Sequence, residues 1–197
     1  MLALFANRKY SAERMLRPQD VLVACKLLVL GRDSWSYSRL GGSLSLAPSE
    51  VHAAVRRCQV SGLLSAGKLT VDKRRLLDAC TVGVPTIYYA VRGAVAMGIP
   101  TATHAACLEG LFPEREAGAI CKVWPCEGGP DGVAGESLLP LYPTVPRAVR
   151  HDERLHEILA LVDVVRVSDL TDRRGREDHK IACDLLKKAI LHGEGVR

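Results

Sequence analysis

The sequence predicts an α+β protein: a basic helical N-terminal third, then a strand- and loop-rich segment, then C-terminal helices. Apolar residues recur at helical spacing in residues 19–64 and again in residues 151–191. Most of the prolines and many glycines fall between them, in residues 82–146. These observations divide the chain into two domains, residues 1–80 and 81–197.

The first predicted helix is the apolar run QDVLVACKLLVL, residues 19–30. Pro18 suits the first helical turn, where its missing N–H costs nothing, and Gly31 suits the end of the helix. Because nearly all of its positions are apolar, we expect this helix to be buried.

A short second helix is expected around Leu40 and Leu44, with Ser34 or Ser36 as its N-cap. The adjacent Gly41 and Gly42 lower its intrinsic propensity by about 1 kcal/mol per glycine. Packing must therefore hold this helix, and close approach to a neighbouring helix is one reason for glycine there.

A third helix is predicted from Ser49, as its cap, to about Leu64. Its core-facing stripe has the spacing i, i+3, i+4 and i+7 and consists of Val51, Ala54, Val55 and Cys58. The opposite face carries Ser49, Ala53 and Arg56, flanked by His52 and Arg57.

The remaining elements follow from shorter signals. A turn at 66–68 leads to a possible short strand at 69–71, and Asp72 is expected to cap a helix over 73–80. The runs TIYYAV (86–91) and CKVWPC (121–126) indicate strands. Helical stripes in the C-terminal part are formed by Leu155, Ile158, Leu159 and Val162, and by Ile181, Leu185 and Ile190.

The charge is unevenly distributed. Residues 1–80 hold thirteen Lys and Arg against six Asp and Glu, whereas residues 81–150 and 151–197 each have one excess acid. The whole positive excess of this +5 chain therefore lies in its first eighty residues. This asymmetry favours a polyanionic partner for the N-terminal segment.

The stretch WSYSRLGGSLSLAPSEVHAAVRRCQVSGLL, residues 35–64, resembles the helix-turn-helix of winged-helix transcriptional regulators of the MarR and GntR types. The resemblance covers about residues 18–80. Matching positions are Leu40, Leu44, Ser49, Val51, Ala54, Val55 and the run Gly62-Leu63-Leu64. Such regulators usually have alanine where Gly41 stands and often glycine where Ser45 stands.

This resemblance implies a winged helix-turn-helix that binds double-stranded DNA. A helix fits the major groove, where Arg56 and Arg57 would bind guanine or phosphate and Ser49 a phosphate oxygen. Lys68 would contact phosphate from the wing. The candidate contact residues are Arg39, Ser49, His52, Ala53, Arg56, Arg57, Lys68, Lys73, Arg74 and Arg75.

A second resemblance extends over nearly the whole chain. The segments GIPTATHA, VWP, LLPLYPTVPRAV and LHEILALVDVVR are similar to uncharacterised bacterial helix-turn-helix proteins linked to abortive-infection nucleotidyltransferase toxins. It implies a toxin–antitoxin or phage-defence setting and carries no residue role.

Other chemical interpretations are weaker. His104, Cys107, Cys121 and Cys126 lack the C-x₂-C spacing typical of zinc, and Cys107 with His104 lacks an orienting acid for a nucleophile. The glycines of 127–135 do not lie between a strand and a helix, as a nucleotide-binding loop would. Asp163 and Arg166 indicate an intrahelical ion pair. We therefore expect no enzyme activity, metal or cofactor.

Two function classes remain. The first is a sequence-specific regulator, a repressor acting as a homodimer on a palindromic operator, paired through its C-terminal helices or the arm 1–17. In that arm Arg8 and Lys9 are alternative DNA contacts. The second is an antitoxin-like interaction module that binds a toxin or enzyme partner. In either case the segment 81–150 is open to two interpretations: a packed, rigid connector, which is favoured, or a surface that binds an effector or partner through Trp124, Tyr142 and 140–146.

The location is expected to be cytoplasmic without membrane contact. The chain has no apolar run of membrane-spanning length, and its start lacks the features of a signal peptide. The seven cysteines, odd in number and scattered singly, are typical of a reducing compartment.

Overall fold

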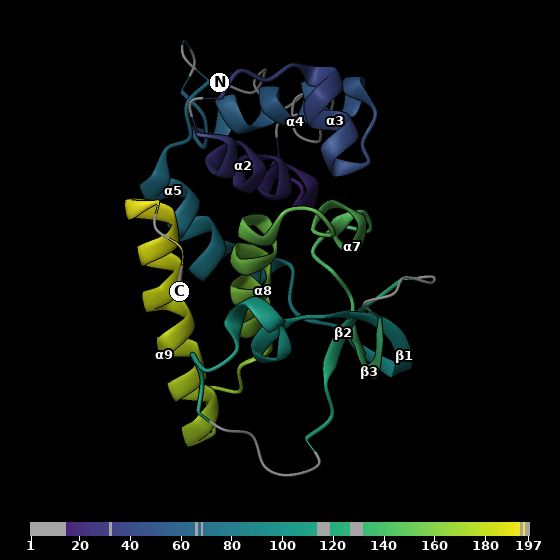
Figure 1. The fold of residues 1–197 in the computed structure, drawn as a ribbon. Helices are drawn as coiled ribbons and strands as arrows, with labels where there is room; N and C mark the ends of the chain where they lie inside the picture. Colours follow the sequence, from purple (N-terminus) through teal and green to yellow (C-terminus); the bar gives the residue numbers. More distant parts are fainter. Residues whose placement is uncertain are drawn as a thin grey trace, which may run out of the picture.

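Helix α8 (Glu153–Val167) lies at the centre of the fold, with the other elements around it (Figure 1). The computed structural model describes residues 15–31, 33–65, 67, 69–113, 119–126, 132–193 and 195. Helix α9 (Arg173–Lys187) covers one side of α8, helix α2 (Pro18–Leu30) crosses one end, and a small sheet lies on the far side from α9. The α+β class is confirmed.

The N-terminal third contains α2, α3 (Tyr37–Leu44) and α4 (Pro48–Ser61). Pro18 begins α2, and Gly31 ends it with φ of 61°, as the sequence predicts. Ser36 caps α3, since its hydroxyl accepts a hydrogen bond from the Arg39 backbone at 3.2 Å. The buried character predicted for α2 is also confirmed, because most of its side chains are buried.

The ends of α4 differ from the prediction. Pro48 is the first residue and Ala47 occupies the cap position, so Ser49 is not the cap. The Glu50 carboxylate accepts the Ala47 N–H at 2.8 Å and replaces the expected serine cap. The helix ends at Ser61 rather than Leu64, because Gly62 has a left-handed backbone with φ of 78°.

A tight turn joins α3 to α4. Ser45 adopts the left-handed conformation, with φ of 53° and ψ of 43°. A Cβ atom at Gly41 would lie 2.6 Å from the Leu46 carbonyl oxygen and 3.5 Å from Val51. The expected close approach at Gly41 is therefore present, although its nearest neighbour is the turn backbone rather than a helix.

A short hairpin follows α4, in which residues 64–65 pair with residues 70–71. An isolated antiparallel bridge pairs Leu64 with Val71, and the Ser65 N–H donates to the Thr70 carbonyl at 2.9 Å. The expected strand at 69–71 is thus reduced to this bridge. Asp72 caps α5 (Lys73–Asp78) as predicted, by accepting the Arg75 N–H at 3.0 Å. A π-turn (Ala79–Gly83) and α6 (Val84–Ile87) continue the chain.

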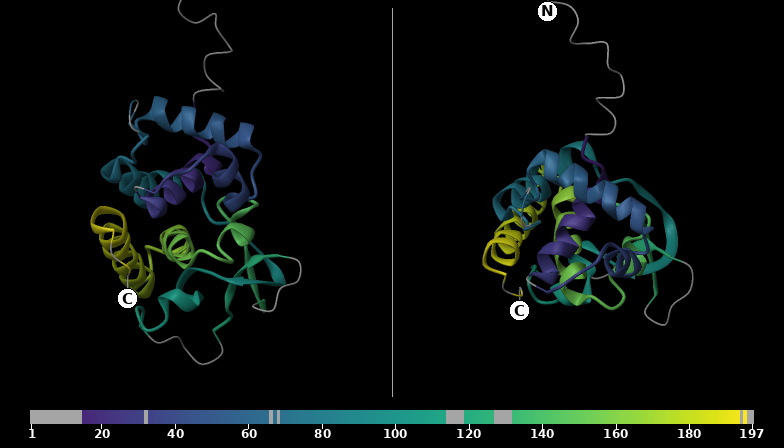
Figure 2. Two further views of the ribbon diagram at one scale, coloured as in Figure 1. Left: turned by 45° about the horizontal axis from the view of Figure 1, so that its top comes forward. Right: turned by 90° about the horizontal axis from the view of Figure 1, so that it is seen from above.

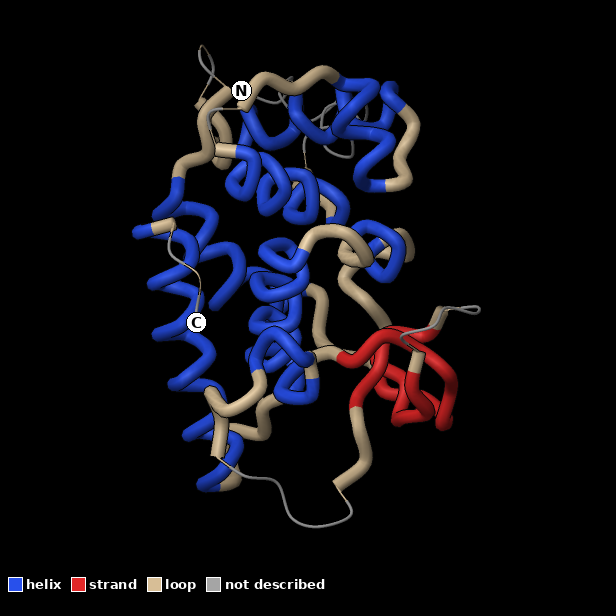
Figure 3. Tube along the Cα trace, viewed as in Figure 1, coloured by secondary structure: helices blue, strands red, loops and turns tan. Residues whose placement is uncertain are grey.

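Three strands form a small closed sheet (Figure 3). Strand β1 (Arg92–Pro100) pairs antiparallel with both β2 (Lys122–Pro125) and β3 (Val133–Leu138), which are parallel to each other. The strand predicted in CKVWPC is confirmed. The one predicted in TIYYAV is wrong, because Thr86 and Ile87 belong to the helical turn α6, which has Pro85 near its start, and the backbone beyond Ile87 is irregular up to β1.

The C-terminal helices bury their own apolar stripes. Helix α7 (Val145–Ala148) precedes α8, and a π-turn (Lys188–His192) extends α9. Leu155, Ile158, Leu159 and Val162 are each at most 2 % exposed within the single chain. In α9 and its extension Leu186 and Ile190 are fully buried, and Leu185 is half-buried. The α8 stripe is therefore covered within one chain and needs no second copy, whereas Ile181 and Leu185 of the α9 stripe remain half-buried.

One hydrophobic core crosses the predicted domain boundary at residue 80. It includes Leu22 and Leu44 from the N-terminal third together with Leu159 and Leu186 from the C-terminal helices. Lys26 of α2 also pairs with Asp152 at the start of α8, at 2.5 Å. Within the described ranges no helix is long and apolar enough to cross a bilayer.

Candidate nucleic-acid interface

The outer face of α4, formed by Ser49, His52, Ala53, Arg56 and Val60, is turned away from the core. Ser49, His52 and Arg56 are exposed and Ala53 is half-buried. Val60 is 57 % exposed, close to Arg56 around the helix. The structure therefore brings four of the sequence-predicted contact residues onto one accessible helix face.

Arg57 does not belong to this face, and its predicted role in DNA contact is wrong. It is 6 % exposed, and its Nε and Nη2 atoms donate to Asp20 Oδ2 and Oδ1 at 2.8 and 2.7 Å. These hydrogen bonds raise the pKa of the Arg57 guanidinium. Because Asp20 lies in the first turn of α2, Arg57 instead holds α4 onto α2.

An aromatic row, Trp35–Tyr37–His52, borders the outer face of α4. The ring centroids of Tyr37 and His52 lie 5.2 Å apart, and those of Trp35 and Tyr37 lie 5.5 Å apart in an edge-on arrangement. Sequence reasoning missed Trp35 and Tyr37. The available signal was an aromatic pair beside the Ser36 cap, close in sequence to the predicted recognition helix.

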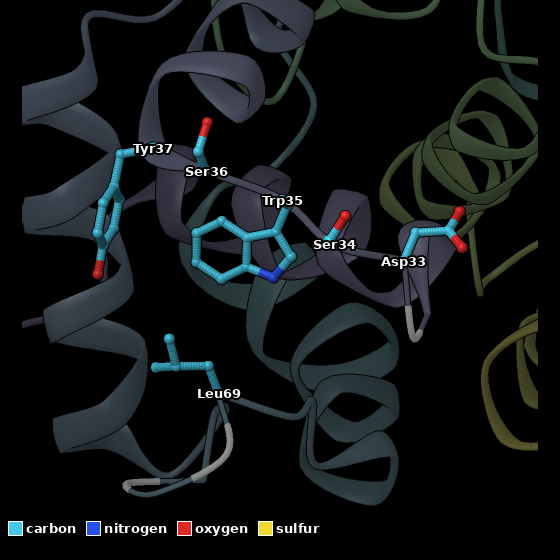
Figure 4. A pocket seen from close by; sticks show the side chains of 6 residues that line it. All are labelled: Asp33, Ser34, Trp35, Ser36, Tyr37 and Leu69. Carbon is cyan, nitrogen blue, oxygen red and sulfur yellow. The ribbon is translucent and has the colours of Figure 1, made fainter.

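Two shallow hollows flank Tyr37. One, of about 360 Å³, is lined by Trp35, Leu69 and the segment 33–37 (Figure 4). The other, of about 300 Å³, lies against α4 and is lined by Tyr37, His52, Val55, Arg56 and Gln59. The surface around α4 is therefore contoured by aromatic side chains beside an exposed guanidinium.

The cations of α5 are exposed, but two of them also make structural contacts. Arg75 Nη1 donates to the Ser61 carbonyl at the end of α4 at 3.0 Å, and its Nε lies 3.8 Å from Asp72. Lys73 Nζ donates to the Leu191 carbonyl at 2.9 Å. Arg74 is exposed.

Of the other predicted contacts, one is exposed on the surface and one lies outside the described residues. Arg39 lies exposed on α3. Lys68, the proposed wing contact, lies outside the described residues, as do Arg8 and Lys9.

The Asp163–Arg166 pair is buried rather than solvated. Asp163 Oδ1 accepts from Arg166 Nη1 at 2.5 Å, while its Oδ2 accepts from Thr101 and Trp124. Burial raises the pKa of Asp163, and these three donors act in the opposite direction. Arg166 also donates to the Tyr88 and Tyr89 carbonyls. The pair therefore joins α8 to the sheet and the 88–89 loop.

The segment 140–146 and Trp124 are largely buried, which agrees with the favoured interpretation of a packed connector. Trp124 is 1 % exposed and its indole N–H is used by Asp163, so it cannot face an effector. Within the described residues, no three His, Cys, Asp or Glu side chains lie together as a metal site would require. Cys107 is buried, and Cys121 and Cys126 are half-buried.

A scan against protein-family models, a search of curated proteins and a search of solved structures found no match to this chain. The resemblance to winged-helix regulators therefore remains a prediction from the sequence. The candidate interface rests on the geometry of α3, α4 and the hairpin.

Proposed function

We propose that this chain binds double-stranded DNA as a sequence-specific transcriptional regulator, with α4 in the major groove. The observation that supports the proposal is that two adjacent arginines on α4 differ in burial. Arg57 is buried with Asp20, whereas the adjacent Arg56 is exposed on the outer face with Ser49 and His52. Because Arg57 fixes α4 to α2, α4 can present its outer face to the DNA major groove, which is roughly 12 Å wide.

The turn between α3 and α4 supports the same proposal. Ser45 in its left-handed conformation and the contact of Gly41 with Leu46 fix the two helices against each other. Arg39 on α3 is proposed to contact phosphate, while Arg56 reads base edges. We propose that the hairpin after α4 takes the place of a wing and that Lys68 contacts phosphate from it.

Repression by a homodimer on a palindromic operator remains part of the proposal. One helix in one groove makes few base contacts. Specific DNA binding typically has a dissociation constant of about 10⁻⁸–10⁻¹¹ M, so we expect two protomers to bind the two halves of a palindrome. Because the α8 stripe is buried within one chain, pairing would use another surface, such as the arm 1–17.

The test is selection of binding sites from randomised duplexes with the full-length protein. A palindrome is expected, and Arg56→Ala should lose about 1–3 kcal/mol on the selected site. On scrambled DNA the same variant should lose much less. Unchanged affinity of Arg56→Ala for the selected site would remove α4 from this role.

Lys68→Ala serves as a contrast in the same titrations. A phosphate contact carries no sequence information, so this variant should weaken binding to all duplexes alike and reduce the salt slope by about one.

Val60 favours a second candidate function, a docking module for a toxin or enzyme partner. This side chain is 57 % exposed on the outer face of α4, where an apolar contact suits a protein interface. Salt separates the candidates, because DNA binding weakens steeply with ionic strength and apolar docking does not.

A further inference from the structure

We infer that the DNA-binding surface continues from α4 onto the end of the C-terminal helix, where a second patch contacts phosphates beside the site that α4 reads. The α5–C-terminal patch consists of Lys73, Arg74, Lys187, Lys188 and His192, all exposed. The inference rests on the proposed DNA binding and extends it to a surface that the sequence did not connect with α4.

Two hydrogen bonds make the three elements continuous. Arg75 joins the start of α5 to the last turn of α4 through the Ser61 carbonyl. Lys73, two residues earlier, joins α5 to the Leu191 carbonyl in the π-turn that extends α9. The two halves of the patch lie more than a hundred residues apart in sequence and are nevertheless held side by side (Figures 1 and 2).

The cations of the patch are available to bind phosphate. Among the described residues, Arg74, Lys187 and Lys188 form no ion pair with a carboxylate. Within the same described ranges, the exposed acids near the patch are Asp72, which caps α5, Asp78 on α5 and Asp184 on α9, and they form no ion pair with Arg74, Lys187 or Lys188. The last turns of the C-terminal helix thus add cations to the only net-basic third of the chain.

A duplex is the partner whose chemistry fits this arrangement. Double-stranded DNA carries a phosphate charge about every 1.7 Å along its axis, so a second cluster of cations beside a groove-binding helix meets further phosphates. Lysines at a helix C-terminus also interact favourably with the helix dipole. The test must therefore measure a quantity that this structural role does not change.

The experiment compares two double variants of the full chain. Lys187→Gln/Lys188→Gln removes two charges from the patch. Arg173→Gln/Lys180→Gln removes two exposed charges from the first half of α9, away from α5. Affinity is measured by fluorescence anisotropy over a salt series, on the selected duplex either trimmed to its core or extended on both sides.

Wild type should prefer the extended duplex, and its salt slope should be steeper there. Lys187→Gln/Lys188→Gln should show a weaker preference for the extended duplex and lose about two from the slope on it, whereas the control pair should match wild type. Equal slopes for the two variants, or no length preference in wild type, would overturn the inference.

Two further variants keep the outcomes separable. Arg74→Gln changes a side chain on α5 that has no partner among the described residues. This variant should lose about one from the same salt slope. Because it leaves the end of α9 intact, its result does not depend on a change in that helix. Arg56→Ala tests α4 itself. If Arg56→Ala loses site affinity while all patch variants keep the wild-type slope, the inference fails and the proposed function stands. If Arg56→Ala has no effect, the proposed function fails.

Discussion

Arg57 and Asp20 form a two-pronged, buried ion pair between α4 and the first turn of α2, with N···O distances of 2.8 and 2.7 Å. The neighbouring Arg56 points outward. Two adjacent arginines on one helix therefore have different functions, one in packing and one on the surface. Cys58 adds a contact to the same turn of α2, since its thiol lies 3.4 Å from the Asp20 carbonyl.

The first prediction concerns this pair. Arg57→Met leaves the Asp20 carboxylate buried without its guanidinium and should lower the free energy of unfolding by about 3–5 kcal/mol. Arg56→Met, one residue earlier on the exposed face, should change it by less than about 0.5 kcal/mol. Urea unfolding followed by circular dichroism measures both. Similar losses in the two variants would contradict the division between them.

The double variant Asp20→Leu/Arg57→Met provides a control for the origin of the loss. Replacing both charges by apolar groups removes the uncompensated carboxylate, so this protein should be more stable than Arg57→Met alone. A double variant as unstable as Arg57→Met would assign the loss to packing rather than to charge.

The second prediction uses the paired glycines of α3. Alanine at Gly41 would place its Cβ 2.6 Å from the Leu46 carbonyl and push the α3–α4 turn apart, so Gly41→Ala should destabilise the protein. A Cβ at Gly42 meets nothing within 4 Å. Gly42→Ala should therefore stabilise it, by up to about 1 kcal/mol, through helix propensity. Thermal unfolding of both variants checks the opposite signs.

Local signals in the sequence were sufficient to predict much of the helical third. Four helix ends were predicted correctly: Pro18 begins α2, Gly31 ends it, and Ser36 and Asp72 cap α3 and α5. Ser49 failed as a cap because Pro48 is the first helical residue, and Glu50 satisfies the free N–H of Ala47.

The remaining differences depend on long-range contacts. On a helical wheel Arg57 lies at the border of the outer face, and only the position of Asp20 on another helix draws it inward. In the sequence, the apolar stripes of α8 and α9 are equally compatible with a dimer interface and with burial in the core of one chain. The burial of α8 follows from its packing against α9, α2 and α6, which periodicity does not reveal.

The third prediction concerns pH. Burial lowers the pKa of His156 below its ordinary value of 6.5, although its hydrogen bond with the Pro100 carbonyl at 2.9 Å acts in the opposite direction. Below pH 6.5, His156 binds a proton in the unfolded chain but not in the folded chain. Stability should therefore fall as pH drops through 6.5 toward the folded pKa, by at most about 1.4 kcal/mol per pH unit.

His156→Gln retains an N–H donor for Pro100 and cannot ionise in this range. Urea unfolding at pH 7.5 and 5.5 should show a smaller difference for this variant than for wild type. An identical difference in the two proteins would assign the pH dependence to other groups.

The last prediction concerns the C-terminal helices. Had they served only for pairing, deletion of residues 151–197 would leave a folded monomer. The structure instead uses α8 as the centre of the core, and Asp152 both caps α8 through the Leu155 N–H and pairs with Lys26. The truncated chain should therefore be insoluble or lack cooperative unfolding, because the buried side of α2 loses its cover. Circular dichroism and thermal melts of the truncated protein check this, and a cooperative transition in residues 1–150 would contradict it. Sedimentation of the full-length protein tests pairing independently: a monomer at tens of micromolar would remove the homodimer and leave the core assignment unchanged.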